Sequence, residues 1–205
     1  MASALLIPAA PSLVVAWSSY KFRAAAIAAF IGAVLPDASL FLMFAIAKAQ
    51  GVSEHVIFSE WYYSEFWQGL GAMTNSIPIY AFVALTAYIL QKSTNQNSVG
   101  IRRWYGVISI VGLAAFIHTL TDLPLHHDDG HPHFWPFSHW VYASPISYWD
   151  PNHYGAEWSL VELVLAAVFI VLLWRRYANR LARFGLLLAA ISYAAMSLFW
   201  LNAFG

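Results

Sequence analysis

Cysteine and charge are the two things that this chain lacks. None of its 205 residues is a cysteine, which excludes disulfide bonds and thiolate metal sites, so any bound metal must be held by nitrogen and oxygen. Charged residues make up only 10% of the sequence and hydrophobic residues 60%, whereas soluble domains are roughly one-quarter charged. This composition predicts an integral membrane protein.

The apolar residues form runs that match a membrane-spanning helix, which needs about 20 residues. Four runs reach that length plainly, and a fifth, at residues 157–174, is slightly short. We therefore expect an all-α fold, a bundle of about five transmembrane helices that forms one domain over residues 1–205. The expected helices cover residues 24–47, 69–90, 104–123, 157–174 and 181–203, and a His/Asp/aromatic-rich outer loop covers residues 124–156.

The opening stretch, Ala4–Ser19, is apolar but short, and Pro8 and Pro11 interrupt it. No basic residue precedes it, as a signal peptide would require. We expect a re-entrant or interfacial helix that stays in the mature protein.

The basic residues predict how the bundle is oriented in the plasma (inner) membrane, because Lys and Arg are retained in cytoplasmic loops. Nine of the ten lie on one side of the expected bundle, and Lys48 lies on the other. Loops 92–103 and 175–180 should be cytoplasmic, and loops 48–68 and 124–156 extracytoplasmic. No basic patch typical of nucleic-acid binding occurs on the outer side, so membrane lipids are the expected partners.

The stretch from His118 to His153 holds seven of the eight histidines and four aspartates but no Lys or Arg, a composition typical of a metal site or a proton-handling site. His118 and Asp122 are four residues apart and share a helix face, which His126 continues if the helix survives Pro124. Bundle metal sites are built from such pairs. The alternative is a buried His–Asp hydrogen bond that ties two helices together.

Two polar residues lie inside other expected helices. Asp37 follows Pro36 near the middle of the first, where an ionisable group needs a partner and marks a functional site. Its alternative role is to cap a helix that Pro36 has broken. Asn75, near the outer end of the second helix, would orient a ligand or pack helices together.

The outer loop and the fourth helix add further candidates. Asp129, His131 and His133 alternate, so they would point to one side of an extended segment and offer more ligands. The prolines and aromatic residues nearby predict a rigid loop that folds over the bundle as a lid. Glu162 lies about one turn inside the fourth helix, where it would act as a ligand, a general base or a partner of a histidine.

Four motifs together resemble a family of integral-membrane proteins described as membrane-bound metal-dependent hydrolases. They are LPD at 35–37, NSIP at 75–78, HTLTDLPLHHDDGHPHFWPFS at 118–138 and SPISYWDPNHYG at 144–155. The resemblance implies a small helical bundle with a divalent metal held by Asp37, His118 and Asp122. Broader relatives carry an HRG…THS motif where this chain has WQGLGAMTNS, and an N-terminal histidine where this chain has Leu13.

The leading hypothesis is a hydrolase that depends on a divalent metal, zinc or alternatively manganese, and acts on a lipid or another amphiphile at the extracytoplasmic membrane face. A metal there would bring the pKa of a bound water down to about 7. The expected ligands are Asp37, His118 and Asp122, with His126 or His131 completing the set, Glu162 or Asp129 as general base, and Asn75 and His133 as supporting residues.

The alternative hypothesis is a non-catalytic accessory subunit whose apolar, aromatic-rich faces pack against a larger membrane complex. Two absences favour it, that of the histidine-bearing HRG…THS motif and that of the N-terminal histidine. The outer loop fixed by prolines favours it too. An ion or proton transporter is a third hypothesis, against which the lack of an inverted repeat argues.

Overall fold

The computed structural model describes residues 22–148, 150–176 and 180–204, which contain helices and loops and no strand. The all-α prediction is confirmed for these residues, whereas the predicted N-terminal helix, Ala4–Ser19, lies outside them. The chain divides into two compact units. The first holds the described residues up to Leu123 together with Gly130–Tyr142, and the second holds Pro124–Asp129 and the described residues from Ala143 onward. The single domain stays a prediction.

The first expected helix, 24–47, is in fact two helices. α2 (Phe22–Val34) and α3 (Ala38–Ala49) are separated by Leu35–Asp37, and the helical stretches on either side are bent by 67°. Pro36 explains the break, because proline has no backbone N–H to donate and disfavours helical geometry in the residue before it. An apolar run alone did not reveal this interruption.

The second expected helix, 69–90, begins earlier and is also broken. α5 (Glu65–Thr74) and α6 (Ile77–Ser93) meet at Asn75 and Ser76. Ser76 caps α6 by accepting a hydrogen bond from the Ile79 backbone N–H, a usual role for serine at a helix start. Before α5, the outer loop forms the short helix α4 (Glu54–Val56) and the π-helical turn η3 (Ile57–Trp61).

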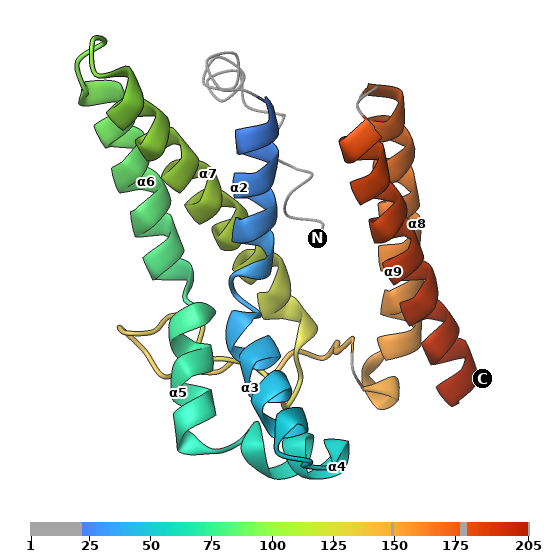
Figure 1. The fold of residues 1–205 in the computed structure, drawn as a ribbon. Helices are drawn as coiled ribbons and strands as arrows, with labels where there is room; N and C mark the ends of the chain where they lie inside the picture. The colour runs from blue at the N-terminus through green and yellow to red at the C-terminus, as the bar shows by residue number, and fades with distance from the viewer. Residues whose placement is uncertain (1–21, 149, 177–179, 205) are drawn as a thin grey trace. The chain divides into compact units, whose positions relative to one another are not determined.

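α7 (Val99–Asp122) packs along both α2 and α6 (Figure 1). Glycines allow these close approaches. A Cβ at Gly32 of α2 would collide with the Val111 carbonyl of α7, and one at Gly112 of α7 would lie 2.8 Å from the Ala84 backbone nitrogen of α6. Close contacts through small residues are typical of helix packing in membranes, where burial of apolar surface does not drive association.

The second unit contains two long helices, α8 (Gly155–Arg176) and α9 (Arg180–Phe204), which pack against each other. At their connected ends the Arg183 guanidinium lies 4.9 Å from the centre of the Trp174 ring. The 3₁₀ turn η5 (Pro151–His153) precedes α8, and another, η4 (Leu123–Leu125), follows α7.

Three helical stretches are long and apolar enough to cross a membrane, and the α2–α3 pair makes a fourth if it counts as one broken span. The three are Glu65–Ser93, Val99–Leu125 and Gly155–Arg176. The described part of α9 contributes the shorter apolar stretch Ala182–Ala195. The chain is thus compatible with a membrane protein, but the predicted count of five crossings is not confirmed.

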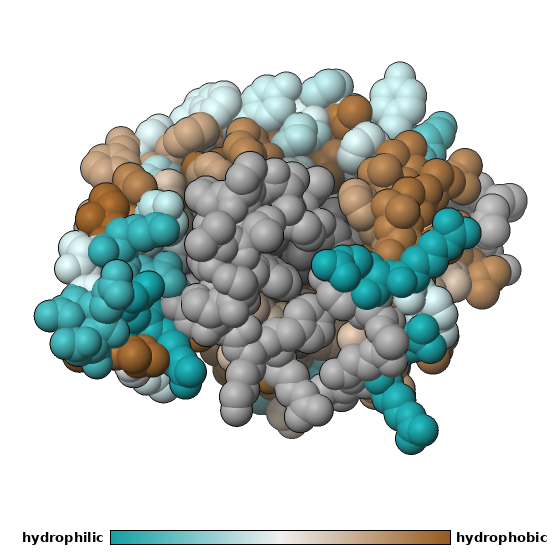
Figure 2. All heavy atoms as spheres, turned by 90° about the horizontal axis from the view of Figure 1, so that it is seen from above, coloured by the Kyte–Doolittle hydropathy of each residue, from teal (hydrophilic) through white to brown (hydrophobic). Residues whose placement is uncertain are grey.

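Basic residues mark the turn that joins α6 and α7. Seen from that end of the molecule, one hydrophilic patch lies over this turn (Figure 2), where the sequence has Lys92, Arg102 and Arg103. Farther along α6, Phe82, Leu85 and Ile89 are exposed, as expected of a lipid-facing helix. Which end faces the cytoplasm stays a prediction.

Candidate functional site

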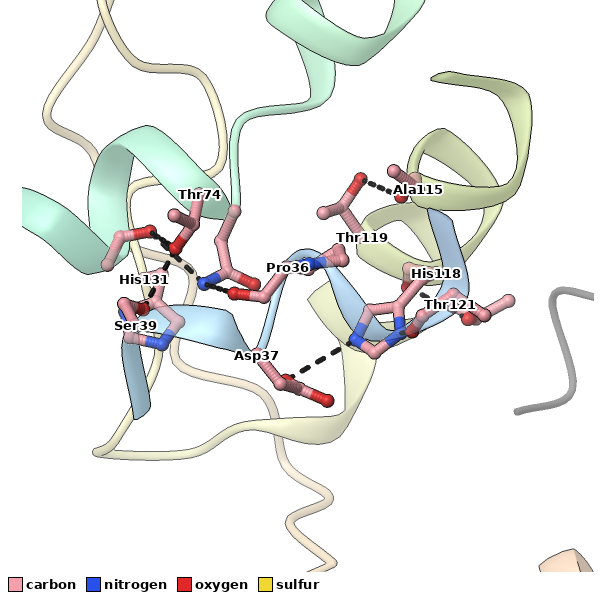
Figure 3. Close-up of polar contacts among 12 residues, drawn as sticks. Pro36, Asp37, Ser39, Thr74, Ala115, His118, Thr119, Thr121 and His131 are labelled. Atoms are coloured by element: carbon pink, nitrogen blue, oxygen red, sulfur yellow. Dashed lines mark hydrogen bonds and ion pairs between the residues drawn. The ribbon is translucent and has the colours of Figure 1, made fainter. Parts of the chain in front are cut away.

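The break between α2 and α3 presents Asp37 to α7. Asp37 occupies the N-cap position of α3, yet its side chain makes no capping hydrogen bond. Its carboxylate instead faces His118 (Figure 3), with Oδ1 3.6 Å from Nε2. Asp37 therefore has His118 as a polar partner, and its side chain does not cap α3.

His118 is held by its other ring nitrogen. Nδ1 lies 2.7 Å from the carbonyl oxygen of Ala33, near the end of α2. A carbonyl oxygen only accepts, so Nδ1 carries the hydrogen and Nε2 presents a lone pair to Asp37 whenever the ring is neutral. The His118 side chain is 13% exposed and the Asp37 side chain 36%, so the pair lies at the edge of the packed helices.

Asp122 lies one turn beyond His118, at the last residue of α7, and is half-buried. It is close enough to act electrostatically on the His118 ring. The helix does not continue to His126, because α7 ends at Asp122 and η4 follows. The predicted face therefore holds His118 and Asp122 but not His126.

The two helix breaks are joined by Asn75. Its Nδ2 donates to the Pro36 carbonyl at 3.2 Å and to the Gly71 carbonyl at 3.1 Å. The residue is 2% exposed, and its buried Oδ1 has no hydrogen-bond partner. Beside it Ser39 of α3 and Thr74 of α5 hydrogen-bond at 2.9 Å. Asn75 thus both packs the helices and presents an acceptor.

The segment Gly130–Tyr142 lies against the second break. His133 Nδ1 donates to the Asn75 carbonyl at 3.0 Å, and the His133 carbonyl accepts from the Ile77 N–H at 2.9 Å. His131 packs on Gly71, where a Cβ would lie 2.9 Å from its Cε1, and its Nε2 is 3.5 Å from the Tyr62 hydroxyl. His133 therefore hydrogen-bonds to both sides of the α5–α6 break, and His131 packs against α5.

The remaining candidates belong to the second unit. His126 Nδ1 lies 2.9 Å from Asp129 Oδ1, so Asp129 pairs with His126. Glu162 is half-buried on α8 and interacts electrostatically with Tyr193 of α9. Asp129 thus has a histidine as its local partner, and the role of either carboxylate as general base stays a prediction.

Sequence reasoning missed a further histidine pair in the second unit. The rings of His127 and His153 stack with centroids 3.6 Å apart and planes inclined by 18°. His127 Nδ1 donates to the Ser144 carbonyl at 2.6 Å, and His153 Nδ1 lies 2.6 Å from Asp150 Oδ2. The D-P-N-H spacing at 150–153 was the available signal, since an aspartate that starts a 3₁₀ turn reaches the residue three positions later.

The first unit brings some of the predicted ligands together. Among the residues that the structure describes, no three His, Asp or Glu side chains lie together as a metal-holding set. What the first unit does assemble is the Asp37–His118 pair with Asp122 beside it, and Asn75 at the adjoining break. Comparisons of the chain with models of protein families, with curated proteins and with solved structures find no match.

Proposed function

We propose that this protein is a divalent-metal-dependent hydrolase of the membrane, with His118 and Asp37 holding the metal and a lipid or another amphiphile as substrate. One observation carries the proposal: the distance of 3.6 Å between His118 Nε2 and Asp37 Oδ1, with Nδ1 anchored to the Ala33 carbonyl. The resemblance of the LPD and HTLTD motifs to membrane-bound metal-dependent hydrolases supports the same assignment.

The separation of the two atoms is that of an ion pair when the His118 ring is protonated, and it also suits a metal ion shared between them. A separation of 3.6 Å is too long for an N–H···O bond. Two atoms that each lie about 2.1 Å from a tetrahedral zinc ion are about 3.4 Å apart. The pair therefore needs little movement to accept a metal.

The anchoring of His118 supports the same role. Histidines that bind metals usually donate their other ring N–H to a carbonyl or carboxylate, which fixes the tautomer and the ring orientation. The Ala33 carbonyl does this for His118. It thereby aims the Nε2 lone pair at the Asp37 carboxylate.

The chain offers one more oxygen ligand and one neutral acceptor nearby. Asp122 is the nearest additional carboxylate on the same helix, and Asn75 Oδ1 is a buried acceptor at the adjoining break. A site with only a few protein ligands is compatible with hydrolysis, because a catalytic metal keeps positions open for water and substrate. A bound divalent metal would polarise an ester or phosphoester oxygen and acidify a water molecule.

The test is elemental analysis of protein purified in detergent, after incubation with zinc or manganese and removal of excess metal. We expect about one equivalent in wild type, and its loss in His118→Ala and Asp37→Asn. His55→Ala is the matched control, because His55 is exposed on α4. Metal retained by both site variants, or absent from wild type, would overturn the proposal. If the site stands, the loaded protein is next screened for hydrolysis of lipid esters and phosphoesters.

A second candidate, ion or proton transport, is favoured by the two broken helices. Discontinuous helices around a substrate or ion site are typical of secondary transporters. Here the two breaks meet through the hydrogen bond from Asn75 to Pro36, beside the ionisable Asp37. Reconstitution into vesicles with an internal pH dye distinguishes the two functions. The hydrolase requires no flux, whereas a transporter gives flux that Asp37→Asn abolishes.

A further inference from the structure

The segment Phe134–Tyr142, which we name the aromatic loop, exposes large apolar rings. Phe137 is 83% and Trp140 54% exposed, and Val141 and Tyr142 are also exposed. The Trp140 ring lies between those of Phe134 and Tyr142, with centroids 6.0 and 5.7 Å away. The sequence has no Asp, Glu, Lys or Arg between Asp129 and Asp150. A contiguous surface of this kind is unusual where only water covers it.

The aromatic loop is fixed at one level of the helices. The Ser76 hydroxyl donates to the Trp135 carbonyl, and the Ile77 N–H donates to the carbonyl of His133, just before the loop. Backbone hydrogen bonds from Phe137 and Ser138 to the Phe134 carbonyl hold the loop's own shape. The loop is therefore anchored beside the α5–α6 break.

The basic residues at the other end of the same helices set the depth of that break. A hydrocarbon core about 30 Å thick takes about 20 helical residues. Counted from Lys92 along α6 and α5, that length reaches Ala72. Counted from Arg103 along α7, it reaches Leu123. Both counts place the far boundary of the hydrocarbon core next to the α5–α6 break, at the level where the aromatic loop is anchored.

We propose that the aromatic loop inserts into the lipid interface on the side of the membrane opposite the α6–α7 turn, where its rings contact lipid headgroups and the first acyl carbons. Trp and Tyr concentrate at this depth because their rings are apolar and their polar tips still reach water. Phe82, Leu85 and Ile89 of α6 are exposed as well, as a helix in contact with lipid requires. The inference rests on the helices crossing a membrane and is independent of the metal.

The absence of cysteine allows a direct test, because one introduced cysteine carries a unique spin label. Phe137→Cys is labelled with a nitroxide in phosphatidylcholine vesicles, and collisions with oxygen and with a water-soluble nickel chelate are compared by electron paramagnetic resonance. Phe82→Cys, 70% exposed on α6, is the hydrocarbon reference. Asn97→Cys, exposed in the α6–α7 turn, is the water reference. The oxygen-to-nickel ratio at Phe137 should be several-fold above that at Asn97 and below that at Phe82.

Three results would overturn the proposal. A ratio equal to that at Asn97 means that the loop faces water. An immobilised label shielded from both reagents means that a protein partner or a second copy covers it. A ratio typical of water at Phe82 means that α6 does not cross the bilayer. Trp140→Cys is the second labelled variant if Phe137→Cys does not fold, and loss of metal binding alone leaves the inference intact.

Discussion

The polar side chains of the two units meet in different ways. In the first unit, contacts join residues far apart in the chain: His118 to Ala33 across 85 positions, and His133 to Asn75 across 58. In the second unit, the two His–Asp pairs span only three positions each. The first arrangement exists only when the helices pack, whereas the second depends mainly on loop geometry. Changes that separate helices should therefore affect the first and leave the second.

The largest loss of stability should follow from Asn75→Leu. The change removes the amide that donates to the Pro36 carbonyl, and an unsatisfied buried group costs about 1–3 kcal/mol. The Gly71 carbonyl keeps the Asn75 N–H as its donor. The larger leucine also overpacks a position that is only 2% exposed, which costs about 1–3 kcal/mol more. We expect the free energy of unfolding to fall by about 2–4 kcal/mol, which lowers Tm by about 10 °C. Thermal unfolding in detergent measures this. Asn97→Leu, at an exposed turn position, is the control, and an unchanged Tm in Asn75→Leu would show that the amide does not join the breaks.

A smaller effect should follow from Gly32→Ala, which acts on helix packing alone. The added Cβ collides with the Val111 carbonyl and lies 2.8 Å from the Ala114 Cβ. Overpacking of this kind costs about 1–3 kcal/mol. Since Ala33, the next residue, anchors His118, metal retention should fall together with stability.

Gly69→Ala is the matched control for that change, because nothing lies within 4 Å of its added Cβ. Elemental analysis and thermal unfolding of both variants make the comparison. If Gly32→Ala retained wild-type metal and stability, the close approach of α2 and α7 would not position the site.

The smallest predicted change in stability is in the second unit, and it depends on pH. The hydrogen bond from His153 to the Asp150 carboxylate lowers the pKa of Asp150. A carboxyl with a lower pKa in the folded state stabilises the fold above its unfolded pKa of about 3.9, and this stabilisation is lost as the pH falls through the folded value. Wild type should therefore be slightly more stable than Asp150→Asn at neutral pH.

The stability difference between wild type and Asp150→Asn should shrink as the pH falls below the ordinary aspartate pKa of about 3.9 and disappear once the pH is below the lowered pKa of folded Asp150. Thermal unfolding at both pH values measures it, with Asp128→Asn, at an exposed position, as the control. A stability difference that persists in acid would mean that the Asp150 carboxylate is not its source. Metal retention at Asp37 and His118 should not change in either variant.

Local sequence patterns predicted most of the secondary structure and the first candidate site residues. Apolar runs predicted α7 and α8 to within a few residues, and the four-residue spacing of His118 and Asp122 placed them on one helix face. The same patterns did not predict that the α2–α3 and α5–α6 stretches are interrupted, although Pro36 was considered as a residue that breaks the first helix. Apolar composition is the same for a continuous helix and for two bent ones, so it does not register a break.

The site was harder to predict than the helices. Asp37, His118 and Asn75 were chosen because polar groups inside apolar helices need partners, but the partners of His118 and Asn75 include the backbone carbonyls of Ala33 and Pro36. Every residue has a carbonyl, so sequence gives no sign of which one accepts. The stacked pair of His127 and His153 was missed for a related reason, because face-to-face contact depends on how two loops fold together.

By itself, the sequence determined that the chain is helical and apolar, that any metal would be held by nitrogen and oxygen, and that its ionisable groups concentrate in one stretch. These are properties of residue types and short spacings. Only the tertiary structure decided that α2–α3 and α5–α6 are broken, that Asn75 joins the breaks, and that His118 turns toward Asp37. The physical reason is that a helix break leaves backbone carbonyls to be satisfied, and which side chain reaches them depends on how distant segments pack.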